Sequence, residues 1–263
     1  MCRPIVLLAL SSLFVLGFAS AHSCPECGGI GVTNGDFKLL GNGIVRSWVK
    51  LDEAGVPTAV GVTMTEAALE GLAEKNPENP HDLEYALNLP PEAAATGIDH
   101  IGLNWNPEGH IPPGIYDVPH FDLHFYLISW EEREKIVKDE ASLPKFQVAV
   151  PEKFVPPGYI YAPESEEPTM GVHWVDTATP ELNGEPFTAT YIWGSYEGRM
   201  VFFEPMMTRE LLASRPNVTM PIKQPAAVQK DGMYPAEWSI AYDEQRKEIT
   251  IALLGLKKVA AAK

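Results

Sequence analysis

Positively charged side chains are scarce in this chain of 263 residues. Lysine and arginine together number 20, against 35 aspartates and glutamates, so the formal net charge is −15 at pH 7. A protein that binds nucleic acid needs a basic face to neutralise phosphates, and this composition does not favour one. We therefore expect no nucleic-acid partner. The excess of carboxylates is compatible with cation binding, but it also serves simply to keep a protein soluble.

Cysteine is nearly absent, with three residues in the whole chain. Two of them, Cys24 and Cys27, form a Cys-Pro-Glu-Cys motif. A structural zinc site takes about four ligands, and no second cysteine pair completes one. A thioredoxin-like motif would open a helix within a βαβ unit, whereas these cysteines open a glycine-rich stretch. We expect a local disulfide between Cys24 and Cys27 in an oxidising compartment.

Long apolar runs are also lacking, apart from one at the N-terminus. Residues 5–18 carry no charge, follow a short basic start at Arg3, and precede Ala19-Ser20-Ala21, which has the form of a cleavage site. The run is too short for a lasting membrane span. The sequence therefore predicts a signal peptide over residues 1–21, no stable membrane anchor, and a secreted protein.

Several sequence signatures of common enzyme classes are missing. There is no βαβ alternation, no glycine-rich phosphate loop, no repeat of fixed period and no G-x-S-x-G element. What the sequence does contain is a series of short β-forming runs separated by proline and glycine, with only short helical stretches between them. We expect a mainly β domain over residues 43–256, either an antiparallel β-barrel or a β-sandwich. A loose glycine-rich arm over 22–42 would precede this domain, and a tail over 257–263 would follow it.

Histidines cluster in one predicted strand and the loop before it. Three of the seven lie between residues 110 and 124. Side chains alternate between the two faces of a strand, so His120, Asp122 and His124 would share one face and the intervening apolar residues would share the other. His110 lies in the proline- and glycine-rich loop that precedes the strand. This pattern predicts a row of metal-binding side chains backed by a hydrophobic row.

Two later strands each carry one polar residue in an apolar setting. They are His173, within Gly-Val-His-Trp-Val-Asp, and Glu204, within Phe-Phe-Glu-Pro-Met-Met. A buried carboxylate or imidazole must be paired or bound, because leaving it alone costs several kcal/mol. We expect these groups to face the domain interior with the histidine row and to form a metal site there. The predicted ligands are His120, His124, His173 and Glu204, with His110 and Asp122 as further candidates.

Imidazoles and a carboxylate suit a divalent transition metal such as zinc, iron, manganese or copper, and the ligand set does not choose among them. Three protein ligands with an open position would indicate a catalytic site, and a filled shell a structural one. Other interpretations stay open. A histidine in a β core is often a hydrogen-bonded structural residue, Glu204 could instead pair with a buried arginine, and His22 would become a copper ligand if cleavage made it N-terminal. His81 and His100 lie in loop-like settings and are expected to play no part.

The chain resembles a domain family of unknown function found mainly in secreted bacterial proteins. The resemblance is carried by residues 100–110 (HIGLNWNPEGH) and 116–126 (YDVPHFDLHFY), and by later motifs at 171–176 (GVHWVD), 186–188 (PFT), 194–198 (GSYEG) and 203–206 (FEPM). It spans about residues 43–256. It implies a β-barrel-like fold and a homo-oligomer of ring form, and it supplies no reaction.

The sequence therefore predicts a secreted, acidic β protein with a His/Asp/Glu metal site. If the metal acts on a substrate, metal-activated water or Lewis-acid chemistry is the expected class. The alternative is a non-catalytic component of the extracellular matrix or cell surface, associated with calcium through its carboxylates. Asn217-Val218-Thr219 is the N-glycosylation sequon, for use in a eukaryotic secretory pathway.

Overall fold

A computed structural model describes residues 31–74 and 83–262. The predicted signal peptide, the Cys24–Cys27 disulfide, His22 and His81 lie outside these residues. Within them, no helix is both long and apolar enough to span a membrane.

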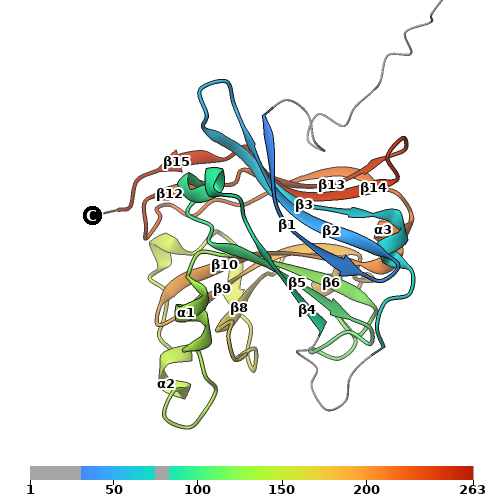
Figure 1. The fold of residues 1–263 in the computed structure, drawn as a ribbon. Coiled ribbons are helices and arrows are strands. Elements are labelled where there is room, and N and C mark those ends of the chain that lie inside the picture. The colour runs from blue at the N-terminus through green and yellow to red at the C-terminus, as the bar shows by residue number, and fades with distance from the viewer. Residues whose placement is uncertain (1–30, 75–82, 263) are drawn as a thin grey trace, which may run out of the picture.

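Two large antiparallel sheets make up most of the described chain (Figure 1). The six-stranded sheet has the order β1 (Val32–Leu40), β2 (Gly43–Leu51), β3 (Pro57–Thr65), β14 (Glu248–Leu254), β13 (Glu237–Asp243) and β11 (Asn217–Pro221). The seven-stranded sheet has the order β4 (Glu84–Asn88), β5 (His100–Asn106), β6 (His120–Tyr126), β10 (Arg199–Thr208), β9 (Ala189–Tyr196), β8 (Val172–Asp176) and β7 (Tyr159–Tyr161). A small third sheet pairs β12 (Gly232–Tyr234) with β15 (Lys257–Val259).

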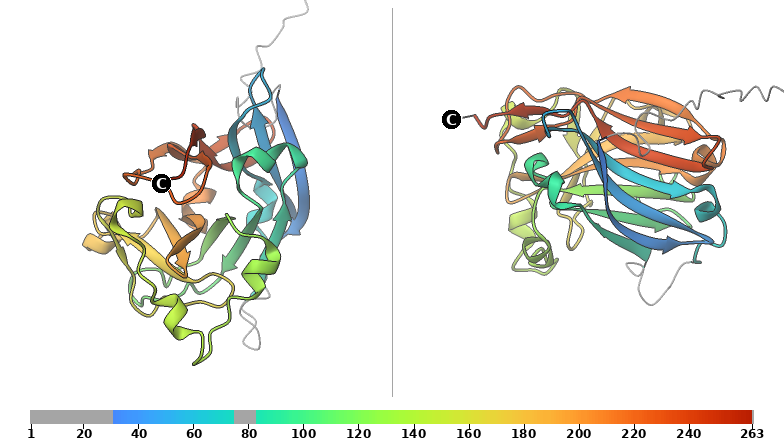
Figure 2. Two further views of the ribbon diagram at one scale, coloured as in Figure 1. Left: turned by 90° about the vertical axis from the view of Figure 1, so that its left-hand side faces the viewer. Right: turned by 45° about the horizontal axis from the view of Figure 1, so that its top comes forward.

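Helices are few and short, as the sequence predicts. The α-helices are α1 (Trp130–Glu134), α2 (Leu143–Phe146) and α3 (Arg209–Ala213), and 3₁₀ turns lie at Glu66–Leu69, Pro91–Thr96, Glu152–Phe154 and Pro180–Asn183. The fold is therefore mainly β. The two sheets lie as separate layers, which Figure 2 shows from two further sides, and their strands do not close into one ladder. The sandwich interpretation is confirmed, and the barrel interpretation is wrong.

The main hydrophobic core lies between the two sheets. From β6 it takes Phe121, Leu123 and Phe125, and from the six-stranded sheet it takes residues such as Val62 of β3 and Ile251 of β14. All of these side chains are fully buried. Strand β6 thus turns its apolar row toward the other sheet, and its histidine row must face the opposite way. The polar row therefore lies on the outer face of the seven-stranded sheet, not in the interior between the sheets.

Connecting segments cover this outer face and bury it. One cluster packs Tyr126 and Phe202 of the sheet against Ile136 and Phe146, from the segment that contains α1 and α2, and against Met170, from the connection between β7 and β8. Figure 1 shows the two helices below the seven-stranded sheet, on the side away from the six-stranded one. A further cluster packs the 107–119 loop and the segment after β8 against the sheet, through Tyr116, Phe187, Ile192 and Met206. These connecting segments thus form a roof over the outer face of the sheet.

Two expected boundaries differ from the structure. The arm predicted over 22–42 contains strand β1, whose residues from Val32 to Leu40 pair with β2. Gly35 lies in a bulge of this strand, where the carbonyl of Asn88 comes so close that a Cβ would clash. At Gly35 the glycine is therefore required by close backbone approach. The tail predicted over 257–263 begins with strand β15.

Candidate metal centre

The six predicted ligands all lie on the outer face of the seven-stranded sheet or in the loop over it. The structure divides them into two groups of three, each with ligand atoms within 4.8 Å of one another. We call His110, His120 and Asp122 the loop group, and His124, His173 and Glu204 the strand group. Each group offers two imidazoles and one carboxylate.

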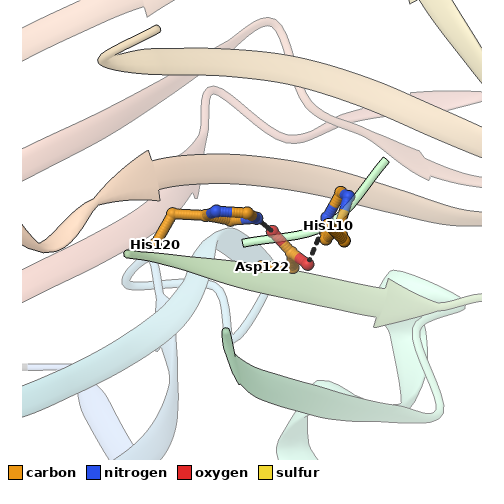
Figure 3. A group of neighbouring side chains, drawn as sticks. All are labelled: His110, His120 and Asp122. Carbon is orange, nitrogen blue, oxygen red and sulfur yellow. Dashed lines mark hydrogen bonds and ion pairs between the residues drawn. The ribbon is translucent and has the colours of Figure 1, made fainter. Parts of the chain in front are cut away.

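In the loop group, one carboxylate lies between two imidazoles (Figure 3). Asp122 Oδ2 lies 3.2 Å from His110 Nε2, and Asp122 Oδ1 lies 3.1 Å from His120 Nε2. His120 and Asp122, which both lie on β6, are buried, whereas the His110 side chain is 37% exposed. His110 reaches the group from the loop between β5 and β6.

Backbone carbonyls fix the orientation of both rings in the loop group. His110 Nδ1 donates to the carbonyl of Ile111 at 2.7 Å, and His120 Nδ1 donates to the carbonyl of Val118 at 2.7 Å. A carbonyl can only accept, so each Nδ1 carries a hydrogen; a ring that is neutral then directs its Nε2 lone pair at the carboxylate, whereas a protonated ring donates to it. Two acceptors that face one another at this distance need a proton or a cation between them.

The strand group repeats this arrangement further along β6. Glu204 Oε1 lies 3.3 Å from His124 Nε2, and Glu204 Oε2 lies 3.7 Å from His173 Nε2. His173 Nδ1 donates to the carbonyl of Ser165 at 3.0 Å, so its Nε2 also directs a lone pair at the carboxylate. His124 and Glu204 are almost fully buried, with side chains 1% and 2% exposed.

Sheet register brings the strand group together. Phe203 pairs with Phe125 and Met206 with Asp122, so Glu204 of β10 lies opposite His124 of β6. His173 of β8 lies two strands further on, opposite a residue of β9. The group is therefore assembled from three different strands of one sheet face.

Gly194 makes room for the Phe202 ring, which packs against both imidazoles of the strand group. Gly194 of β9 lies opposite both His173 and Phe202, and a Cβ at this position would overlap the Phe202 ring. The Phe202 ring instead lies over the glycine, with its centroid 4.8 Å from that of His124 and 5.4 Å from that of His173. This apolar neighbour keeps water away from the imidazoles.

Burial controls the protonation of the strand group. It lowers the pKa of His124 to about 3 and that of His173 to about 4. Burial, followed by the nearby charge of Asp122, raises the pKa of Glu204 well above its usual range. The two imidazoles are therefore neutral at pH 7, which is the form that binds metal.

The loop group behaves differently. Burial alone would raise the pKa of Asp122, but the charges of His120 and His110, together with the hydrogen bond from His110, hold it well below its usual range. For His110, burial opposes the charged form, yet the attraction of Asp122 and the bond to Ile111 raise its pKa. Asp122 is therefore a carboxylate, and in the absence of metal an imidazolium partner would balance its charge.

Both groups have spacings that suit a small metal ion. Around a tetrahedral ion with ligand bonds of about 2.0–2.2 Å, neighbouring donor atoms lie about 3.3–3.6 Å apart. The four imidazole–carboxylate distances run from 3.1 to 3.7 Å. Each group of three could therefore hold a metal ion and leave positions for further ligands, and two His with one carboxylate suit several transition metals.

The sequence does not predict the places of two residues on the outer face, Asn106 and His100. Asn106, at the end of β5, donates from Nδ2 to Asp122 Oδ2 at 2.7 Å and so helps to hold the loop group. His100 opens β5 and is fully buried, stacked between Tyr126 and Trp130 at centroid distances of 4.7 and 3.8 Å. The expectation of a loop-like setting for His100 is therefore wrong. The local sequence Asn104-Trp105-Asn106 does not mark Asn106 as part of the site, because its partner Asp122 lies on the neighbouring strand β6.

Asn217, the predicted glycosylation site, begins the edge strand β11 and is exposed. Its side-chain Oδ1 accepts a hydrogen bond from the backbone of Tyr242 at 3.1 Å. Glycosylation of Asn217 stays a prediction.

Comparison with known proteins gives a single finding. The family described as "TTHB210-like: Hypothetical protein TTHB210" matches residues 52–105. These residues include β3, β4 and most of β5, but none of the six candidate ligands. The chain has no match among curated proteins or among solved structures. The likeness is thus to a family of unknown function, and the site must be interpreted from its own geometry.

Proposed function

We propose that this protein is a secreted metal-binding protein whose principal centre is the strand group. The observation that carries the proposal is a set of buried polar atoms without hydrogen-bond partners. In the part of the chain that the structure describes, both ring nitrogens of His124 and Oε2 of Glu204 have none. Buried polar groups are almost always satisfied, so such a cluster calls for a ligand.

A divalent transition metal is the ligand that fits these atoms. It would be bound by the neutral imidazoles of His124 and His173 and by the Glu204 carboxylate, and it would shift the Glu204 equilibrium toward the ionised form. A protonated Glu204 could satisfy only one imidazole at a time. A metal ion accepts the lone pairs of all three ligands at once.

Three protein ligands leave coordination positions for water or another small molecule. If the ion acts on a substrate, it would polarise a bound carbonyl or lower the pKa of a bound water. The His173 side chain is 17% exposed, more than the other two ligands, so this is the side from which a small molecule would reach the ion.

The test is metal titration of protein stripped with a chelator. Zinc should bind to the wild type, and Glu204→Gln should lose one equivalent while it keeps its fold by circular dichroism. Asp243→Asn is the matched control, because it changes a buried carboxylate of the six-stranded sheet. Unchanged zinc binding in Glu204→Gln would sink the proposal.

The calcium-associated matrix alternative rests on the net charge of −15 alone. Calcium takes six to eight oxygen ligands, whereas each group offers two imidazoles for one carboxylate. The residues of both groups therefore favour a transition metal. Retention of the protein in an insoluble, calcium-dependent extracellular fraction would favour the alternative instead.

A further inference from the structure

We propose that the loop group holds a second divalent transition metal ion, separate from the ion of the strand group and exchanging faster with solvent. The inference rests on the proposed function because both ions would occupy the same sheet face. It assigns the second one to its own three ligands: His110, His120 and Asp122.

The ligands of the loop group are already held in binding orientation. Each imidazole is fixed through Nδ1 by a backbone carbonyl, and Asn106 fixes one carboxylate oxygen. Metal-bound histidines usually donate their other ring N–H to a carbonyl or carboxylate in this way, which sets the tautomer and orients the ring. The loop group thus carries the supporting hydrogen bonds of a metal site.

Two buried atoms of the loop group also lack hydrogen-bond partners. They are His120 Nε2 and Asp122 Oδ1, on side chains that are 0% and 6% exposed. Figure 3 shows them pointing toward one another, with the His110 ring on the other side of the carboxylate. They lie 3.1 Å apart without hydrogen-bond alignment, so the lone pair of the neutral ring faces a lone pair of the carboxylate. A metal ion bonded to both removes this repulsion.

The backbone of the 107–119 loop is shaped to present His110. His110 N donates to the carbonyl of Tyr116 at 3.1 Å, which closes the loop on itself. Gly109 has a φ of +72°, and a Cβ there would clash with the backbone of Tyr116 and Asp117. Only glycine adopts this conformation beside so close a backbone without strain. The ligand is therefore placed by a folded turn.

Strand geometry keeps the two ions apart. Asp122 and His124 are alternate residues of β6, so their Cβ atoms lie about 7 Å apart along the strand. Paired metal ions that share a bridging oxygen lie about 3.5–4 Å apart. The two groups have no ligand in common. The geometry thus points to two mononuclear sites rather than one dinuclear centre.

Exposure distinguishes the two sites. His110 is 37% exposed, whereas the ligands of the strand group are between 1% and 17% exposed. Water and chelators therefore reach the loop site more easily, past the His110 ring. We expect the loop ion to leave first, and the coordination position beside His110 to accept small oxygen-donor ligands from solution.

The experiment counts zinc equivalents in stripped, reloaded protein and follows their release to a coloured chelator. The wild type should hold two equivalents and release them in a fast and a slow phase. His110→Ala should keep one equivalent and lose the fast phase, and His173→Ala should keep one and lose the slow phase. Asp243→Asn should match the wild type, and circular dichroism should show every variant folded.

Asn106→Ala provides a milder variant that keeps all six ligands. It should weaken the fast-releasing site about 10- to 100-fold and leave the slow site unchanged. With copper(II) in both sites, electron paramagnetic resonance should show two mononuclear copper signals that are broadened by dipolar coupling, without the exchange coupling of an oxygen-bridged pair.

Three outcomes would overturn the inference. One equivalent in the wild type that only His173→Ala removes would make the loop group an ion-paired cluster. One equivalent that either variant removes, or an exchange-coupled copper pair, would make the two groups a single centre. By contrast, two equivalents of which His173→Ala removes none would contradict the proposed strand-group centre and leave the loop site standing.

Discussion

The two faces of strand β6 are both buried but carry different kinds of side chain, one apolar and one polar. Phe121, Leu123 and Phe125 point into the core between the sheets, whereas His120, Asp122 and His124 point outward. Both rows are buried. The inner row is stabilised by removal of apolar surface from water, and the outer row by a roof of connecting segments and, as we propose, by metal. Burial alone therefore does not tell core from site: the polarity of the row does.

The largest expected loss of stability comes from a substitution on the inner face of β6. Phe125→Ala removes a fully buried aromatic side chain from the core between the sheets and should lower the free energy of unfolding by about 3–5 kcal/mol. Urea denaturation measures this loss. The variant should keep its zinc equivalents when folded; if metal binding disappears while the fold survives, the two faces are not independent.

A somewhat smaller effect should come from the roof over the outer face. Arg133 of α1 is buried and forms a two-bond ion pair with Glu84 of β4, at 2.5 and 2.6 Å. Glu84→Ala would leave the guanidinium without its carboxylate and should cost about 3 kcal/mol, since a buried charge loses its partner. Urea denaturation of Glu84→Ala beside Arg133→Met tests this reason. The double variant should be less destabilised than the sum of the two, because neither charge remains.

Metal should stabilise the outer face and leave the inner one unaffected. At a free zinc concentration of about 100 times the dissociation constant, one site should add about 2.7 kcal/mol to the free energy of unfolding. Thermal melts of stripped protein with and without zinc measure the gain. In Glu204→Gln the part of this stabilisation that comes from the strand group should be absent. A zinc-dependent stabilisation of full size in that variant would contradict the assignment.

The smallest effect should come from the start of the roof helix α1. The Ser129 hydroxyl accepts a hydrogen bond from the backbone N–H of Glu132, and the Glu132 carboxylate accepts one from the backbone N–H of Ser129. Ser129→Ala removes half of this capping box and should cost about 1 kcal/mol. The exchange of amide hydrogens in α1 should speed up, while that in β14 stays the same; equal acceleration in both would show that the roof and the inner face unfold together.

The sequence predicts the alternation of β6 because a strand has a side-chain period of two, and this pattern is local. The strands that carry His173 and Glu204 follow from the same local signal. The partner of each histidine does not, because it depends on the register between β6 and β10, which places Glu204 opposite His124. It also depends on the path of the loop that returns His110 to Asp122.

The sequence also does not predict which face of the seven-stranded sheet carries the polar row of β6. Local alternation shows that the two rows face opposite ways, but not which one meets the other sheet. Segments far along the chain, such as the one with Ile136 and Phe146, bury the outer face and so make it look like a core. The buried position of His100 has the same origin, since it depends on stacking with Trp130 of the roof.

The most direct test of the central claim is anomalous X-ray diffraction from crystals of the zinc-loaded protein, measured on both sides of the zinc absorption edge. The account predicts a peak about 2.0–2.2 Å from His124 Nε2, His173 Nε2 and a Glu204 oxygen, with a second peak among His110, His120 and Asp122. Peaks confined to surface carboxylates, with the outer face of the seven-stranded sheet free of zinc, would contradict it.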